Sequence, residues 1–134
     1  MQNSKVLKVI LFILGLNLVG IASWRLFDAI GFAEANGIKL GDEISGINEA
    51  KGAAGAIISF GVLIMIGAFN RKMSFTSNLT AITLYLGFGW ARLLSYMVDG
   101  HPGDMIMTGM RGEFVLGLVG VFVFIRYRVT LEKK

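Results

Sequence analysis

Residues 52–69, with the sequence GAAGAIISFGVLIMIGAF, decide the fold because they form an apolar run without an ionisable side chain. An α-helix rises 1.5 Å per residue, so a helix of this length approaches the roughly 30 Å of hydrocarbon in a bilayer. Three further apolar runs of similar length cover residues 6–24, 79–97 and 105–125. None of them alternates apolar and polar residues as a half-buried strand does. The pattern predicts an all-α integral membrane protein, with residues 1–134 forming a single four-helix transmembrane bundle.

The composition favours lipid over water as the solvent of this chain. Apolar residues make up 54% of it and charged residues 16%, against about 25% charged residues in an ordinary soluble domain. A soluble domain of this size with a mean hydropathy of +0.67 would expose much of its apolar side chain to water. The sequence contains no cysteine, which excludes a disulfide framework, a zinc–cysteine cluster and a cysteine nucleophile.

The first apolar run also has features of a signal peptide. Lys5 and Lys8 precede or open it, and Ile21-Ala22-Ser23 would provide a cleavage site. Cleavage would leave three spans and place the basic C-terminal residues outside the cell. We therefore expect residues 6–24 to be retained as a transmembrane helix.

The distribution of lysine and arginine predicts the orientation in the membrane. On one side of the predicted membrane, the ends of the apolar runs carry eight basic residues: Lys5, Lys8, Arg71, Lys72, Arg126, Arg128, Lys133 and Lys134. The other side carries Asp28, Glu34, Asp42, Glu43, Asp99 and Asp104, with Arg25 and Lys39 among them. By the positive-inside rule, both termini are expected to be cytoplasmic, in a multi-pass protein of the cell inner (plasma) membrane. Basic residues at the ends of apolar runs face anionic lipid, so we expect no nucleic-acid partner.

Residues 25–51 form the long connection of this topology, on the outer side. Its first part mixes aromatic and charged residues as interfacial segments do, so Trp24 and Phe27 are candidates to anchor a short helix on the outer leaflet. Asn36-Gly37 and Leu40-Gly41-Asp42 predict turns. A solvated connector and a structured cap over the bundle both agree with this pattern.

Ionisable residues inside the apolar runs are the candidate functional residues, because a charged side chain at a helix centre costs roughly 2.5 kcal/mol or more in lipid. Arg92 lies near the outer end of the third run, and Arg111 and Glu113 lie in the outer half of the fourth. Neither Arg92 nor Glu113 would stay charged alone in hydrocarbon, so we expect these two to pair. Arg111 would then extend its long side chain toward the outer interface.

Further charged residues near this pair complete a candidate cluster, which could be a ligand-binding site or a structural set of ion pairs. Its members are Glu49, Lys51, Arg92, Asp99 and Glu113. No catalytic nucleophile accompanies them. His101 is the single histidine, and its spacing from Asp99 and Asp104 matches no metal-site pattern. We therefore expect neither a metal nor a cofactor.

Small and polar residues within the runs predict close helix packing. The second and fourth runs carry small residues at spacings of three to five: Gly52, Gly55, Ala56 and Ser59, and Gly109, Gly112, Gly117 and Gly120. Such residues let helix backbones approach each other. Asn17, in the middle of the first run, is expected to hydrogen-bond to another helix.

Several short motifs, spread over essentially the whole chain, are similar to those of one known family. They are Glu49-Ala50-Lys51-Gly52-Ala53-Ala54-Gly55, Ala91-Arg92, Asp99-Gly100-His101-Pro102 and Glu113. The family consists of small bacterial membrane proteins grouped as domain of unknown function 4345. The resemblance implies a four-helix membrane fold without an established activity, and it marks Glu49, Arg92, Asp99 and Glu113 as positions to test. Members usually carry an arginine near the position of Lys51, and lysine keeps the charge but loses the planar fork.

Three functions agree with these features. An accessory or scaffold protein, partnered by membrane lipids, a second copy or another membrane protein, would pair its charges fully and leave no cavity. A protein that binds or transports a small anionic ligand or lipid would open a cavity outward, with Arg92 incompletely paired. An intramembrane enzyme would need the same cavity, with Glu113 or Glu49 as general base. The sequence favours the first, non-enzymatic role.

Overall fold

The computed structural model describes residues 1–128, which form five helices and no strand. The helices are α1 (Lys5–Phe27), α2 (Ala29–Ala35), α3 (Ile44–Phe69), α4 (Ser74–Asp99) and α5 (Asp104–Tyr127). All but α2 are long and apolar enough to cross a membrane. The predictions of an all-α protein and of four candidate spans are therefore confirmed. Of the basic residues used to predict the orientation, Lys133 and Lys134 lie outside the described residues.

The connection over residues 25–51, for which a solvated connector and a structured cap both agreed with the sequence, is mostly helical. α1 continues to Phe27, α2 follows, and α3 begins at Ile44 rather than at Gly52. A helix needs only its backbone hydrogen bonds, so polar residues extend it beyond the segment that lipid requires to be apolar. The short helix expected after Trp24 is present: Asp28 caps α2 by accepting a hydrogen bond from the Gly31 N–H at 2.9 Å.

Apart from Asp28 between α1 and α2, the irregular part of this connection is residues 36–43. Both predicted turns contain a glycine with positive φ, +72° at Gly37 and +71° at Gly41. The Gly37 N–H donates to the Glu34 carbonyl at 3.0 Å, and the Ile38 N–H donates to the Ala33 carbonyl at 2.8 Å. These bonds satisfy carbonyls at the end of α2 and turn the chain back toward α3.

α1 and α3 pack as one helix pair, with backbone against backbone at their closest point. A Cβ atom on Gly15 would lie 2.5 Å from the Gly61 carbonyl oxygen, and one on Gly61 would lie 3.0 Å from the Gly15 carbonyl oxygen. Only glycine permits this approach at both positions. Buried leucines of α1, with Ile64 of α3, fill the interface on the side of the chain termini.

α4 and α5 form the second pair, and only some of the predicted small residues pack it. Cβ atoms on Gly117 and Gly120 would collide with Leu86 and Ile82, so the packing role of these two glycines is confirmed. No heavy atom lies within 4 Å of the Cβ position on the other four predicted glycines: Gly52, Gly55, Gly109 and Gly112. The packing role predicted for these four is wrong, because their faces of the helices meet no neighbouring helix.

Three buried polar side chains of α4 join the two pairs. The Ser74 hydroxyl donates to the Gly67 carbonyl at 2.8 Å, and the Ser77 hydroxyl donates to the Leu63 carbonyl at 2.7 Å, both on α3. On its other side, Asn78 donates through Nδ2 to the Gly120 carbonyl of α5 at 3.2 Å. Ser74, Ser77 and Asn78 are hereafter called the polar junction. Together they hold the first turns of α4 between α3 and α5.

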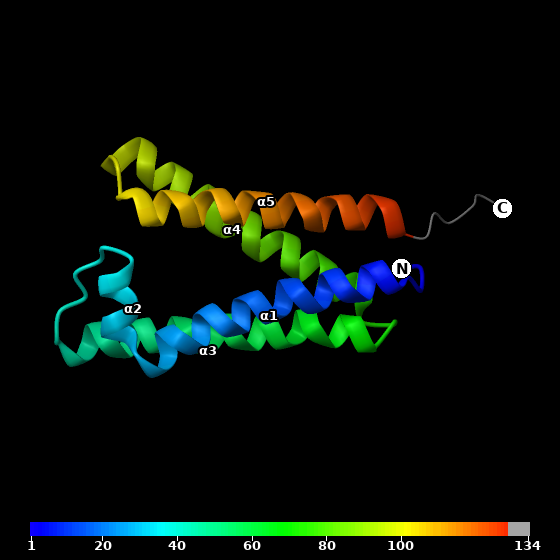
Figure 1. The fold of residues 1–134 in the computed structure, drawn as a ribbon, viewed down its shortest axis with the longest axis horizontal. Helices are drawn as coiled ribbons and strands as arrows, with labels where there is room; N and C mark the ends of the chain where they lie inside the picture. Colours follow the sequence, from blue (N-terminus) through cyan, green and yellow to red (C-terminus); the bar gives the residue numbers. More distant parts are fainter. Residues whose placement is uncertain (129–134) are drawn as a thin grey trace.

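The two helix pairs diverge away from the polar junction. Figure 1 shows the N-terminus and the end of α5 on the side where α4 begins, and α2 at the opposite end, where the α1–α3 and α4–α5 pairs have separated. Within residues 1–128, Cα atoms of α2 approach those of α1 and α3 within 8 Å but not those of α4 or α5, and the Cα atoms of α3 and α5 stay farther apart than 8 Å. The fold is therefore wedge-shaped, closed at the end of the termini and open at the α2 end.

The closest approach of α1 and α3 generates a stability prediction. We expect Gly15→Ala to lower the free energy of unfolding by about 1–3 kcal/mol, because its Cβ would overlap the Gly61 carbonyl and the Met65 side chain. Gly20→Ala, on the same helix, is the matched control, since nothing lies within 4 Å of its Cβ position. Unfolding of both variants in detergent measures the difference. Equal stability of the two variants would contradict the backbone contact.

Candidate functional site

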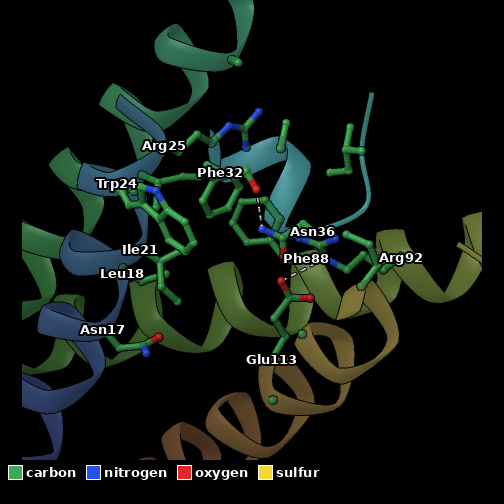
Figure 2. Close-up of a pocket in the computed structure, with 18 of the residues that line it drawn as sticks. Asn17, Leu18, Ile21, Trp24, Arg25, Phe32, Asn36, Phe88, Arg92 and Glu113 are labelled. Atoms are coloured by element: carbon green, nitrogen blue, oxygen red, sulfur yellow. Dashed lines mark hydrogen bonds and ion pairs between the residues drawn. The ribbon is translucent and has the colours of Figure 1, made fainter. Parts of the chain in front are cut away.

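A cavity of about 560 Å³ occupies the open part of the wedge. Its walls come from all five helices and from the connection after α2 (Figure 2). Two of the glycines that meet no neighbour, Gly109 and Gly112 of α5, belong to its lining. The cavity thus has two structural causes: the divergence of the helix pairs and the missing side chains on this face of α5.

The lining is mostly apolar and aromatic. Trp24 of α1 and Phe32 of α2 meet edge to face, with ring centroids 5.3 Å apart, so they attach α2 to the end of α1. Phe88 of α4 faces them across the cavity (Figure 2). Aliphatic side chains line the part nearer the polar junction: Leu18, Ile21, Ile57 and Leu116. A cavity of this size and lining suits a small organic ligand.

Polar side chains gather at the α2 end of the cavity. Arg92 donates through Nε to Glu113 Oε1 at 3.0 Å, which confirms the predicted ion pair. Arg25 of α1 and Asn36, which ends α2, also line the cavity, and Arg25 lies on the other side of Phe32 from Arg92 (Figure 2). Asn36 uses its Nδ2 group to donate to the Phe32 carbonyl at 2.8 Å. Four polar side chains from four different segments therefore surround one end of an apolar space.

The Arg92–Glu113 pair uses only part of its hydrogen-bonding capacity. Glu113 Oε2 is buried and has no hydrogen-bond partner in the described chain. The Arg92 guanidinium makes no second hydrogen bond or ion pair to residues 1–128, so its two terminal nitrogens have no protein partner. A guanidinium can hold a carboxylate with two parallel bonds, and this geometry provides one. One donor group and one acceptor atom thus remain for another molecule.

A second polar contact lies at the deep end of the cavity. The Tyr85 hydroxyl is 2.8 Å from the Leu14 carbonyl and 3.0 Å from Asn17 Oδ1, so it links α4 to α1. The expected hydrogen bond between Asn17 and another helix is confirmed, with Asn17 Oδ1 as the acceptor. Tyr85 was not predicted as its partner, although a buried tyrosine hydroxyl in an apolar run itself signals that an acceptor lies nearby.

The remaining charged residues of the predicted cluster lie away from the cavity. Glu49 and Lys51 are exposed; their neighbour Ala50 lines the cavity, and consecutive helical residues point about 100° apart. Asp99 is also exposed and accepts a hydrogen bond from the Ser95 hydroxyl at 2.9 Å. Arg111 is exposed, as expected. The structure thus brings Arg92 and Glu113 together and leaves Glu49, Lys51 and Asp99 apart from them.

The loop between α4 and α5 shows no constellation for a metal ion. His101 Nε2 lies 3.9 Å from Asp104 Oδ1, and its Nδ1 accepts a hydrogen bond from the Gly103 N–H at 3.1 Å. Across residues 1–128, no three His, Asp or Glu side chains converge as a metal site requires.

Besides Tyr85, the polar lining residues that the sequence analysis missed are Arg25 and Asn36. Arg25 was assigned to the outer connection, but α1 continues through it. Leu18, Ile21 and Arg25 follow the spacing of one helical face, so an extension of α1 would have placed Arg25 beside the apolar lining. The sequence predicted only a turn at Asn36. Its place in the cavity lining depends on the position of α2 beside α1 and α3.

A comparison with family sequence models matches the family described as domain of unknown function (DUF4345) over residues 6–124. The chain belongs to this family. The resemblance drawn from the short motifs is confirmed, since the match covers nearly the full chain. Neither the curated proteins nor the solved structures include a match. The DUF4345 family brings no activity with it, so the function rests on the geometry of the cavity.

The ion pair generates a prediction that a double-mutant cycle can test. We expect Arg92→Gln and Glu113→Gln each to destabilise the protein more than the double variant does. Each single change leaves one half-buried charge without its partner, whereas the double change removes both charges. Unfolding in detergent should give a coupling energy of about 1 kcal/mol. Additive effects of the two substitutions would show that the pair contributes nothing to stability.

Proposed function

We propose that this DUF4345 protein is a four-span bundle of the bacterial inner membrane, with both termini cytoplasmic, and that it binds a small anionic ligand from the outer side. The four apolar helices and the basic residues beside the termini and between α3 and α4 support the orientation. In this orientation the cavity opens toward the outer leaflet, with α2 above it.

The incompletely paired Arg92 beside the cavity is the observation that carries this proposal. An accessory or scaffold bundle was expected to pair its charges fully and to leave no cavity. Instead, the terminal nitrogens of Arg92 and Glu113 Oε2 have no partner among residues 1–128, and they border a space of about 560 Å³. The geometry therefore favours the ligand-binding role.

The two charged side chains have distinct roles in this proposal. Arg92 donates two hydrogen bonds to a carboxylate or phosphate oxygen pair, which its planar fork suits. Glu113 orients Arg92 through Nε, and its second oxygen accepts a hydrogen bond from a hydroxyl or amine of the ligand. The ligand is thus expected to carry an anionic group with a hydrogen-bond donor close to it.

Binding fits the structure better than transport or catalysis does. Beyond Tyr85 the cavity ends at the close-packed core and the polar junction, where Ser77 and Asn78 are fully buried. A ligand that crosses the membrane would have to separate α4 from both α3 and α5. The cavity lining includes no serine, threonine, cysteine or lysine that could act as a nucleophile.

Native mass spectrometry of the detergent-purified protein tests the proposal. We expect the wild type to carry a bound molecule whose mass identifies the ligand class. Arg92→Gln should lose it by removing the anion contact. Gly112→Leu should also lose it by filling the cavity, since no heavy atom opposes its Cβ. Gly87→Leu on α4 is the matched control, because Gly87 is exposed, meets nothing within 4 Å and does not line the cavity. A wild type without adduct, with an Arg92→Gln variant that unfolds, would instead indicate a structural ion pair.

The orientation is tested separately by labelling with a membrane-impermeant maleimide. The chain has no cysteine, so single cysteines can be introduced without background. Asp42→Cys, in the connection between α2 and α3, should react on intact cells with a permeable outer membrane. Lys72→Cys, between α3 and α4, should react only after lysis. Both positions are exposed, and the reverse pattern would overturn the orientation.

A further inference from the structure

We infer that the ligand is a single-chain anionic amphiphile that enters the cavity sideways from the outer leaflet, between α1 and α5. The inference rests on the proposed function and specifies both its ligand class and its route. Three features carry it: an opening that faces hydrocarbon, a net positive charge at the α2 end, and an apolar channel between the two.

Apart from Ile38 in the connection after α2, the exposed part of the cavity lining lies on α1 and α5. Every lining residue from α3 and α4 is buried or half-buried. On α1, by contrast, Asn17, Ile21 and Trp24 are exposed, and so is Gly109 on α5. Because α1 and α5 are both candidate spans, the opening between them faces lipid. A molecule dissolved in the bilayer reaches the cavity without crossing water.

The charges at the α2 end suit one anionic head group. Arg25 makes no hydrogen bond or ion pair with any part of the chain that the structure describes, and Arg92 is bonded only through Nε. Two guanidinium groups and the single carboxylate of Glu113 leave a net charge of +1. The backbone of α2 lies apart from those of α4 and α5, which leaves room for a head group at this end.

The apolar part of the cavity suits a hydrocarbon tail. Arg92 and Tyr85 are seven residues apart on α4 (92 − 85), which is about 10 Å along the helix. Leu18, Phe88 and Leu116 line the space between these two levels. A short water-soluble anion would fill only the charged end. A tail longer than about 10 Å would continue through the opening between α1 and α5 into the bilayer.

The inference is tested by quenching of Trp24 fluorescence with 9,10-dibromostearate in phosphatidylcholine vesicles. Trp24 lines the cavity, whereas the second tryptophan, Trp90, packs against Phe114 outside it. A Trp90→Phe background therefore reports on the cavity alone. We expect saturable quenching that stearate reverses, with stearyl alcohol at least tenfold weaker because it lacks the charge, and butyrate without effect because it lacks the tail.

Variants separate the cavity from the surrounding lipid. Gly109→Leu places a side chain in open space at the opening and should weaken binding about tenfold, while Gly87→Leu should leave it unchanged. Quenching that rises linearly and equally in all variants would mean that Trp24 meets only bulk lipid, and it would overturn the inference. Competition by butyrate as strong as by stearate would also overturn it, but would leave an anion site and hence the proposed function intact. Loss of the adduct in native mass spectrometry, by contrast, tests the proposed function itself.

Discussion

The polar junction is the constraint on which the rest of this structure depends. Ser74 and Ser77 bond to carbonyls of α3, and Asn78 bonds to a carbonyl of α5, so one end of α4 is tied to both of its neighbours. In an apolar environment a buried hydroxyl or amide without a partner is costly, so these contacts hold α4 in one position. Since the helix pairs are joined at this end and cross at an angle, they must separate toward the α2 end. The cavity is the consequence of that geometry.

The glycines show how one residue type serves opposite purposes in the same fold. At Gly15 and Gly61 the absent side chains bring two backbones into contact, and at Gly117 and Gly120 they admit Leu86 and Ile82. One to two helical turns away on α5, Gly109 and Gly112 meet nothing and help to form the cavity. The spacing pattern is similar in both stretches of the helix. Only the distance to the neighbouring helix, which the polar junction controls, decides whether a glycine packs or leaves space.

The Arg92–Glu113 pair combines a structural and a chemical role. Its single short bond joins α4 to α5 at the end where the two pairs have separated. A fully satisfied bidentate pair would be chemically inert toward a ligand. Here the terminal nitrogens of Arg92 and one oxygen of Glu113 have no partner among residues 1–128, and Arg25 adds a second guanidinium from α1. An anionic group bound to Arg92 would satisfy donors that the protein leaves unused.

The sequence by itself determined the all-helical architecture, the four long apolar helices and the Arg92–Glu113 pair. These follow from local or one-dimensional rules: the length of an apolar run, and the need of a charge at a given depth for a partner at the same depth. It also indicated the short helix after Trp24 and the turns at Gly37 and Gly41, because caps and positive φ angles are encoded locally. Only the tertiary structure decided that Glu49, Lys51 and Asp99 lie apart from the pair, that a cavity exists, and that Arg25 and Asn36 line it. Those outcomes depend on the rotation of each helix about its axis and on the angle between the helix pairs. Contacts between residues far apart in the chain set both the rotation and the angle. Neither can be read from a single run of residues.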